Sequence, residues 1–535
     1  MEAYAGHFYP ESPMGGCATG QVMPGAYRDP KAEGERALFE GCTFGIWNED
    51  AYQLYLDVDT LHQILEQIDP ESLRADRIAS ALEGFTLAVD FEQPLEGRIA
   101  DYQRARARLR PAMEAHNGSS APVMYAVGNA HLDLAWLWPM AETYLKTART
   151  FAAQLRHLEE YPEYRFIQSQ PAAYEMCREH YPELFARILE AKKGGRWIAE
   201  GAMWVEPDTN MTGGESLVRQ LIHGKRYYKE TLGVDSVVLW LPDTFGYSAA
   251  LPQILAGCGV KYLVTQKIFW SYNEGDTFPY HYFTWQGADG SRIDTFLPTS
   301  YTYRTDPNEL CEAWQKRVEK RGLDSFLLPF GYGDGGGGPC RDHIEYARRA
   351  GDIEGVPKVR MESPTRFFER MEAEGDPRHT YVGELYFSAH RGVYTSQAAI
   401  KKGNRAGEIM LREAELWGAI AAHGGWEYPL QRMDAAWKRL LLNQFHDILP
   451  GSSIARVYEE ARKDHRWIIE EAEDVADSAR GVLMKEGGVT VFNSLSFDRA
   501  ELVALPEAFV GGAETADGAL ALINAPACGA VSLAL

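Results

Sequence analysis

The sequence predicts an α/β protein with a seven-stranded, barrel-like domain, followed by a three-helix bundle and the start of a further β domain. Short apolar, β-branched runs alternate with helical segments from residue 123 onward, which predicts a parallel sheet with helices outside it. From Thr395 the apolar residues repeat with a long helical period. After Gly487 the chain returns to short strand-like runs.

Two regions precede the alternating pattern. Residues 1–49 are rich in glycine and proline without a clear period, and we expect a tail or a partial β unit there. Residues 50–118 are expected to form a helical linker, because Ala, Leu and Arg favour helices and Pro70 and Pro94 punctuate them. The helices predicted in this linker cover residues 60–67, 73–88 and 96–115.

Residues 119–390 carry the pattern of the catalytic domain. Strands are predicted at 123–128, 164–169, 196–200, 237–241, 262–265, 293–297 and 325–330. Helices are predicted between several of them, at 143–159, 171–191, 216–231 and 248–257. Parallel strands in this number indicate a closed or incompletely closed barrel, in which functional residues collect at the carboxyl ends of the strands.

The rest of the chain divides into two regions. Residues 391–486 are expected to form a three-helix bundle, because short breaks separate long amphipathic segments. The helices predicted there cover 395–423, 433–446 and 454–484. Residues 487–535 are expected to be the start of a C-terminal β domain, and an incomplete one. The strands predicted in it cover 489–492 and 501–505.

Charge and cysteine content narrow the classes of partner and compartment. The chain has 54 Lys and Arg against 76 Asp and Glu, and the net charge of −22 argues against nucleic acid or an anionic membrane as its partner. We find no run of 18 apolar residues and no signal peptide, so we expect a cytoplasmic protein without a membrane span. The 7 cysteines are scattered without a Cys-x-x-Cys pair, which is typical of reduced thiols.

The first candidate ligands follow the strand predicted at 123–128. His131 and Asp133 are two residues apart, so in an extended segment both side chains point to one side and could bind one divalent metal. Trp136 and Trp138 stand beside them, and indole faces are good platforms for sugar rings. A His-x-Asp pair also occurs by chance, and a histidine beside a strand is more often structural, so the pair alone does not decide.

Two more candidate ligands lie far downstream. Asp243 follows the strand predicted at 237–241, although a loop or helix-capping role would also explain it. His446 is predicted to lie on a helix with Asp447 beside it, a position where most histidines bind no metal. Neither residue decides the matter by itself.

A glycine-rich loop follows the last predicted strand. Asp334 stands at its start, before four glycines at 335–338, which would let the backbone approach a ligand closely. A flexible turn is the simpler alternative. A Walker-type phosphate loop does not fit, because Pro339 follows where Lys and then Ser or Thr would be needed.

Together these residues indicate one kind of chemistry. Two imidazoles and two carboxylates suit one divalent ion, most simply zinc, with cobalt as the alternative. The residues that would supply them are His131, Asp133, Asp243 and His446. Asp334 remains as a second functional carboxylate. Retaining cleavage of a glycosidic bond requires such a pair of carboxylates, one as nucleophile and one as acid.

A long series of motifs resembles glycoside hydrolase family 38, the retaining α-mannosidases, and is most similar to the cytosolic and bacterial type. The matching segments, spread over roughly residues 50–500, are GNAHLDLAWLWPMAET, GRWIAEGAMWVEPDTNMTGGESLVRQ, LWLPDTFGYSAALPQIL, TQKIFW, FGYGDGGGGP, HRGVYTSQAAIKKGNR and NQFHDILPGSSI. The resemblance implies a seven-stranded α/β barrel, a three-helix bundle and a following β-sandwich region.

The resemblance also implies roles for single residues. Asp243 corresponds to the nucleophile that forms a mannosyl-enzyme, and Asp334 to the general acid/base, whose pKa should then be raised by its surroundings. The residues that correspond to the zinc ligands are His131, Asp133, Asp243 and His446. The residues that correspond to sugar contacts are Trp136, Phe245 and Asp447.

The expected function is therefore that of an exo-α-mannosidase, which removes terminal mannose from oligosaccharides with retention. A zinc-dependent carbohydrate deacetylase and a non-catalytic mannose-binding remnant are the alternatives. Family members are often oligomeric, so the resemblance is consistent with a homo-oligomer. Because most of the family's C-terminal β region is missing, we expect the chain to be a fragment or weakly active alone.

Overall fold

The computed structural model describes residues 45–375, 377, 379–484, 488–505, 513–515 and 518–534. It divides into two compact units: residues up to Ser396 together with Phe445–Val457, and Gln397–Gln444 together with Tyr458–Leu535. The tail or partial β unit predicted at 1–49 lies, up to residue 44, outside the described residues. Among the described residues, no helix combines the length and the apolar character needed to cross a bilayer.

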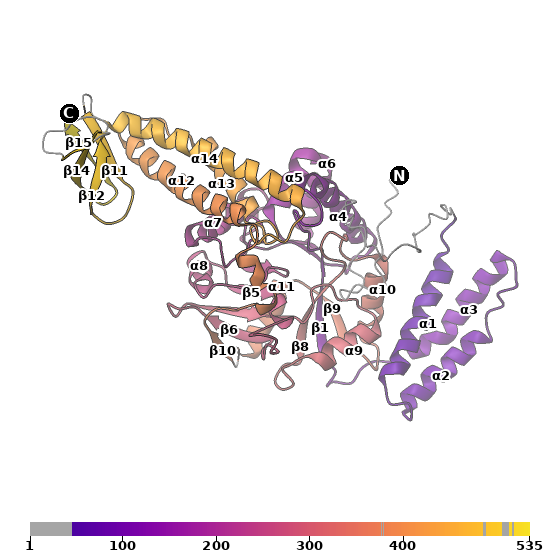
Figure 1. Cartoon of the computed structure of the whole chain (residues 1–535). Helices are drawn as coiled ribbons and strands as arrows, with labels where there is room; N and C mark the ends of the chain where they lie inside the picture. The colour runs from indigo at the N-terminus through magenta and orange to yellow at the C-terminus, as the bar shows by residue number, and fades with distance from the viewer. Residues whose placement is uncertain are drawn as a thin grey trace, which may run out of the picture. The chain divides into compact units, whose positions relative to one another are not determined.

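Two β-sheets with surrounding helices form the first unit (Figure 1). One sheet contains β1 (Val123–Asn129), β2 (Phe166–Gln168), β3 (Trp197–Ala199), β8 (Ser325–Phe330) and β9 (Lys358–Met361). The other contains β4 (Val238–Leu241), β5 (Tyr262–Thr265), β6 (Tyr282–Gln286), β7 (Arg292–Phe296) and β10 (Thr380–Val382). The first runs β3-β2-β1-β8 in parallel, and the second runs β10-β6-β7-β5-β4 with β6 antiparallel to β7.

The α/β class predicted from the sequence is confirmed. Each of the seven predicted strand segments overlaps a strand of the structure, and a parallel bridge between Gly201 and Leu239 links the two sheets. Strands β6, β9 and β10 were not predicted. The closure of these strands into one seven-stranded barrel stays a prediction.

Pairing of β1 with β8 brings together two loops that carry candidate residues. Both strands are apolar and almost entirely buried, as expected for parallel strands covered on both faces. The register joins Val123 to Ser325 and Gly128 to Phe330, so both strands end at the same edge of the sheet. A Cβ on Gly128 would lie 2.3 Å from the hydroxyl oxygen of Tyr164, so this packing requires a glycine.

Most helices predicted between the strands are present with small shifts of their ends. These are α4 (Met140–Glu160), α7 (Gly214–Glu230) and α8 (Leu251–Gly257). The single helix predicted over 171–191 is wrong, because the chain forms α5 (Pro171–His180) and α6 (Pro182–Lys193). Pro182 has no backbone N–H and clashes with the preceding turn, so the first helix ends before it.

Three N-terminal helices form the region that was predicted as a helical linker. They are α1 (Glu49–Gln67), α2 (Leu73–Thr86) and α3 (Leu95–Met113). Asn48 and Ser72 cap α1 and α2, because each side chain accepts a hydrogen bond from a backbone N–H of the first turn. The first unit also contains three helices that were not predicted, α9 (Pro307–Lys316), α10 (Arg341–Arg349) and α11 (Pro364–Glu374). Helix α1 packs against α9 and α10.

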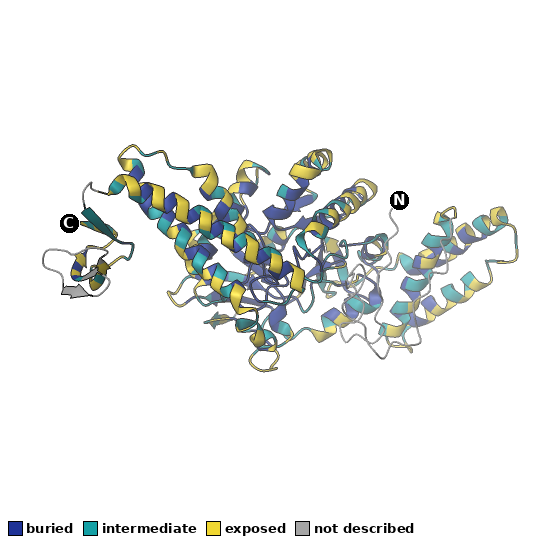
Figure 2. Ribbon diagram, turned by 45° about the horizontal axis from the view of Figure 1, so that its top comes forward, coloured by how far each residue is buried: buried dark blue, intermediate teal, exposed yellow. Residues whose placement is uncertain are grey.

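Three long helices and two small sheets make up the described part of the second unit. The helices are α12 (Ala398–His423), α13 (Leu430–Asn443) and α14 (Ala455–Leu483). A Cβ on Gly407 of α12 would come within 3.5 Å of both Leu440 and Ile468, so the three helices pack closely. The buried residues of α12 recur every three or four positions, and Figure 2 shows buried and exposed residues alternating along the long helices.

The two small sheets of the second unit are antiparallel. Their strands are β11 (Gly488–Asn493), β12 (Arg499–Leu505), β13 (Ala513–Thr515), β14 (Gly518–Ala525) and β15 (Gly529–Ala534). Strand β11 pairs with β15, and β14 lies between β12 and β13. The two strands predicted in this region fall within β11 and β12.

Gly224 offers a test of the packing of α7 against the segment that follows β3. A Cβ there would lie 2.1 Å from the carbonyl oxygen of Ala202, and backbone cannot yield as a flexible side chain can. We therefore expect Gly224→Ala to lower the free energy of unfolding by about 1–3 kcal/mol in denaturant titrations. The control is Gly257→Ala, which faces open space in α8 and should be neutral or stabilise by up to about 1 kcal/mol. Equal effects of the two substitutions would contradict this account.

Candidate functional site

Two candidate ligands lie in the loop that directly follows β1. Residues Asn129 to Asp133 leave the strand without forming a helix, so His131 and Asp133 project to the same side. The Nε2 atom of His131 lies 2.9 Å from Oδ1 of Asp133. Both side chains are at most 2% exposed, so water does not solvate them freely.

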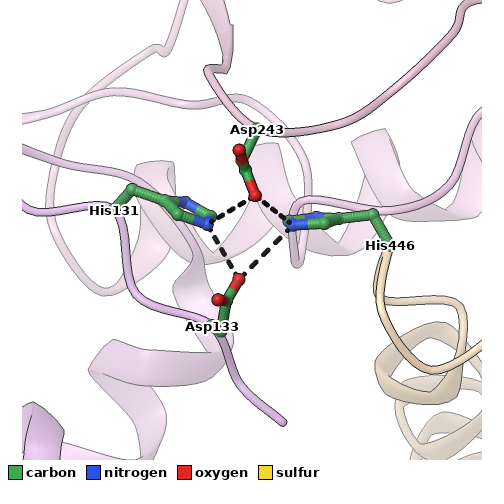
Figure 3. A group of neighbouring side chains, drawn as sticks. All are labelled: His131, Asp133, Asp243 and His446. Atoms are coloured by element: carbon green, nitrogen blue, oxygen red, sulfur yellow. Dashed lines mark hydrogen bonds and ion pairs between the residues drawn. The ribbon is translucent and has the colours of Figure 1, made fainter. Parts of the chain in front are cut away.

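The other two predicted ligands meet this pair from distant parts of the chain (Figure 3). Asp243 lies two residues beyond β4, and its Oδ2 atom is 3.6 Å from His131 Nε2. The Nε2 atom of His446 is 3.5 Å from Oδ1 of Asp133 and 3.5 Å from Oδ2 of Asp243. The prediction that His446 lies on a helix is wrong: α13 ends at Asn443, and His446 occupies the following turn.

The reason for the turn is a long-range backbone contact. Phe445 forms an isolated antiparallel bridge with Pro207, and the N–H of His446 donates to the carbonyl oxygen of Glu206 at 3.2 Å. The chain therefore leaves the helical path where these contacts begin. Helical periodicity in the sequence contains no information about such a partner.

The donor set and its spacing fit a divalent metal. One ligand atom from each of the four residues lies within 4.8 Å of all the others. Donors bonded tetrahedrally at 2.0–2.2 Å would be about 3.4 Å apart. Three of the four distances between imidazole nitrogens and carboxylate oxygens are 3.5–3.6 Å, and the fourth, between His131 and Asp133, is shorter at 2.9 Å. Nε2 of His446 is buried without a hydrogen-bond partner, while Nδ1 donates to the Glu206 carbonyl at 2.8 Å, which leaves the Nε2 lone pair for a metal.

Electrostatics within the cluster favour positive charge at its centre. Burial disfavours a charged His131, but Glu206 and Asp133 outweigh burial and raise the pKa of His131 well above its usual range. Burial is likewise outweighed at His446, where the nearby carboxylates of Asp133 and Asp243, which stabilise the protonated ring, raise the pKa to about 10. Both imidazoles therefore favour the positively charged form, with a proton on each ring nitrogen, when no metal is bound. A doubly charged cation would replace one proton from each ring.

Asp243 is held in its ionised form. Burial alone would raise the pKa of Asp243, but the ammonium of Lys267 and the two imidazoles lower it well below the usual range. Nζ of Lys267 lies 2.7 Å from Oδ1 of Asp243 and 3.4 Å from the ring centroid of Trp270. One oxygen of Asp243 thus faces the imidazoles and the other faces an ammonium group.

Asp334 has the opposite environment. It lies in the turn after β8 with a left-handed φ of 59°, and its Oδ1 accepts a hydrogen bond from the Tyr301 hydroxyl at 2.8 Å. The Tyr301 ring meets the His131 ring edge-on at a centroid distance of 5.6 Å. Burial, and then the charges of Asp243 and Asp133, raise the pKa of Asp334 to about 6. Two carboxyl groups with opposite pKa shifts can divide the work of nucleophile and acid.

The three predicted sugar contacts lie in the same loops as the cluster residues. The ring of Phe245 meets the His446 ring edge-on at 6.0 Å. Asp447 is buried and accepts a hydrogen bond from the Ser452 hydroxyl, and burial followed by the Asp133 charge raises its pKa to about 7. Trp136 is half-buried, and its ring lies 6.1 Å from that of Trp138 in an edge-to-face arrangement.

Sequence reasoning missed three residues that contact the cluster. Lys267 lies in a short 3-10 helix after β5, within the matching segment TQKIFW, and Tyr301 lies in the loop after β7, outside the matching segments; neither was assigned a role. Glu206 occurs within one of the matching segments, in the stretch WVEPD, but no residue beside it in the sequence is a candidate ligand. Its carboxylate Oε2 is 2.9 Å from Nδ1 of His131. Only the folded chain brings these side chains to the site.

Comparison with known proteins decides the family. The model of the glycosyl hydrolases family 38 N-terminal domain matches residues 121–384, and that of the α-mannosidase middle domain matches residues 388–483. This chain belongs to glycosyl hydrolase family 38. The family resemblance expected from the sequence motifs is confirmed.

Several curated family 38 proteins are similar to this chain. Human α-mannosidase 2C1 is 34% identical over 90% of this chain and 46% of its own length. An α-mannosidase of Saccharomyces cerevisiae is 37% identical over 63% of this chain and 32% of its own length. The chain therefore spans about half the length, or less, of the relatives it matches. The crystal structure of an α-mannosidase from Enterococcus faecalis has the same fold, with a TM-score of 0.63 at 19% identity over 72% of this chain and 46% of that one.

Metal stabilisation should depend on His446. We expect Zn²⁺ added to chelator-stripped protein to raise the melting temperature, because a ligand at about 1,000 times its Kd stabilises the folded state by about 4 kcal/mol. His446→Ala removes one donor and should lose most of this increase. The control is His465→Ala, which removes a buried histidine of α14 that is not part of the cluster. An unchanged zinc response in the His446 variant would show that the metal binds elsewhere.

Proposed function

We propose that this chain carries the catalytic site of a retaining exo-α-mannosidase, which hydrolyses terminal α-linked mannose in oligosaccharides. The observation that carries the proposal is the position of Asp243, which belongs to a buried, metal-capable cluster and has a lowered pKa, whereas the pKa of Asp334 is raised. Membership of family 38 supports the same reaction. Because the matched relatives are about twice as long, the activity of this chain by itself is part of the proposal.

Four side chains would hold the metal: His131, Asp133, Asp243 and His446. Two imidazoles and two carboxylates suit zinc and also cobalt, so the choice between these ions is open to metal analysis. When bound, the ion would supply Lewis-acid binding of sugar hydroxyls and so orient the ring.

In the first step, an oxygen of Asp243 attacks the anomeric carbon while the bond to the leaving oxygen breaks. Asp334 gives its proton to that oxygen, so the aglycone leaves as an alcohol. Lys267 and the cluster keep Asp243 ionised, while burial and the neighbouring carboxylates raise the pKa of Asp334 to about 6, so that Asp334 is mostly protonated only below that pH. In the second step Asp334 takes a proton from water, which attacks the same carbon and releases Asp243. Two inversions give net retention.

The remaining proposed residues would bind the sugar in the same subsite. The aromatic faces of Trp136 and Phe245 suit the apolar face of a pyranose ring. Asp447, with its raised pKa, can donate or accept a hydrogen bond to a sugar hydroxyl. None of these contacts requires charge on the substrate, in keeping with the chain's net charge of −22.

The alternatives have less support. A zinc-dependent deacetylase would need a metal and a base but no nucleophilic carboxylate, and neither family model suggests that activity. A non-catalytic mannose-binding remnant would not need opposite pKa shifts at Asp243 and Asp334. Both alternatives predict that no covalent sugar forms on the protein.

The proposal extends to the organisation of the chain. We infer a catalytic domain at 119–390 whose two linked sheets act as one seven-stranded barrel, after a helical linker at 50–118. A three-helix bundle at 391–486 and the start of a β-sandwich region at 487–535 would follow. The five cysteines among the described residues are all free, in line with a cytoplasmic enzyme. A homo-oligomer is consistent with this scheme.

Trapping and stereochemistry test the reaction. With p-nitrophenyl α-mannoside we expect the first product to be α-mannose, seen by NMR before mutarotation, and activity to be lost on chelation. A 2-deoxy-2-fluoro mannosyl fluoride should label Asp243, as seen by mass spectrometry of peptides. Asp243→Asn should lose activity by about 10⁴-fold or more. Turnover by the unaltered chain without any adduct, or with β-mannose as the first product, would overturn the mechanism.

The pH profile tests the role of Asp334. A general acid must be protonated, and the protonated fraction falls tenfold per pH unit above its pKa. Because the pKa of Asp334 is raised to about 6, kcat/KM should fall as the pH rises above that value. Asp334→Asn should lose this alkaline decline while it retains measurable activity on a 2,4-dinitrophenyl mannoside, whose leaving group needs no proton. An unchanged decline in the variant would assign the acid to another residue.

A further inference from the structure

We propose that Glu206 is the positioning residue that orients both imidazole ligands and thereby sets the affinity of the cluster for its metal. The inference rests on the metal site of the proposed function. It concerns a residue outside the four proposed ligands that contacts both histidines.

Glu206 contacts the two histidines through different groups. Its carboxylate Oε2 lies 2.9 Å from Nδ1 of His131. Its backbone carbonyl oxygen accepts hydrogen bonds from Nδ1 of His446 at 2.8 Å and from the His446 N–H at 3.2 Å. In both rings Nδ1 is therefore engaged by Glu206. Nε2 is left to face the carboxylates of Asp133 and Asp243, which is the orientation that a metal ligand needs.

Glu206 is itself held in place by the loop that follows β2. The hydroxyl of Ser169 donates to its Oε1 at 2.8 Å, and its N–H donates to Oε1 of Gln170 at 3.1 Å. The amide of Gln170 also donates to the carbonyl oxygen of Leu132 at 2.9 Å, between the two ligands of the first loop. Gln170 adopts a left-handed φ of 62°, a conformation that costs free energy and lets it reach both loops. Hydrogen bonds thus connect the loops after β1, β2 and β3 to one another.

Packing and hydrogen bonding alone do not explain why a charged side chain is buried at position 206. The residue is 1% exposed, and among the described residues its ion-pair partner is His131. A buried carboxylate is costly, and a glutamine of the same shape could face Nδ1 of His131 without the cost of burying a charge. When one nitrogen of an imidazole binds a metal, however, a carboxylate beside the other nitrogen makes the ring a stronger metal ligand. Loss of that carboxylate typically reduces metal affinity 10–100-fold.

The test is zinc affinity measured on the full chain by competition with a chromophoric chelator. We expect Glu206→Gln, which retains the hydrogen-bond acceptor but not the charge, to raise the apparent Kd about 10–100-fold. Glu206→Ala should raise it further, since the ring of His131 also loses its support. Cobalt substitution gives a second readout, because a reoriented imidazole changes the d–d absorption spectrum without reference to activity.

Glu200 provides a matched control. It is also a buried glutamate, directly after β3, but it accepts hydrogen bonds from the Ser236 hydroxyl and the Val237 and Val238 N–H groups. Glu200→Gln should lower the melting temperature of the metal-free chain and leave zinc affinity unchanged. Ser169→Ala serves where a Glu206 variant does not fold, and should raise the Kd by a smaller factor.

Each outcome bears on the inference. If the unaltered chain binds zinc tightly and Glu206→Gln binds it equally well, the role of Glu206 is overturned while the proposed function stands. Ser169→Ala replaces Glu206→Gln in this comparison where the latter does not fold. An equal loss in Glu200→Gln also overturns it, because the effect is then one of general loosening. If the unaltered chain binds no metal, both this inference and the metal in the proposed function fail.

Discussion

The burial of two carboxylates opposite two imidazoles is the constraint on which this structure depends. Asp133 and Asp243 lie close together in a largely buried region, and like charges there repel strongly. The imidazoles of His131 and His446, together with Lys267, compensate for that charge. Each of these groups comes from a different segment of the chain, except His131 and Asp133, which share the loop after β1. The fold must therefore bring the strand ends together before the cluster can form.

The parallel sheets satisfy this requirement in a simple way. Since β1 and β8 run in the same direction and in register, the loops with His131 and Asp334 leave from one edge. The parallel bridge between Gly201 and Leu239 does the same for the loops after β3 and β4. Side chains separated by more than a hundred residues in the sequence thereby share one small volume. The division of pKa values between Asp243 and Asp334 follows from that arrangement.

Much of the site could be predicted because its residues follow local signals. His131, Asp133, Asp243 and Asp334 each come just after an apolar run that reads as a buried strand, and the topology of parallel sheets then places them at one edge. Where the signal was local but incomplete, the prediction was wrong. Periodicity alone extended a helix across Tyr181 and another as far as His446, although Pro182 ends the one and a distant backbone partner ends the other.

The sequence by itself determined the α/β class and seven of the strand segments of the first unit, because each of these depends on neighbours within a few positions, and it marked four candidate donors and a further candidate carboxylate, Asp334. Tertiary structure alone decided what surrounds them. Glu206 reaches His446 across 240 positions of the sequence, and Lys267 and Tyr301 reach the carboxylates of Asp243 and Asp334 from distant segments. Hydrogen bonds and charge interactions of this kind depend on distance in space, which periodicity and spacing along a chain do not encode.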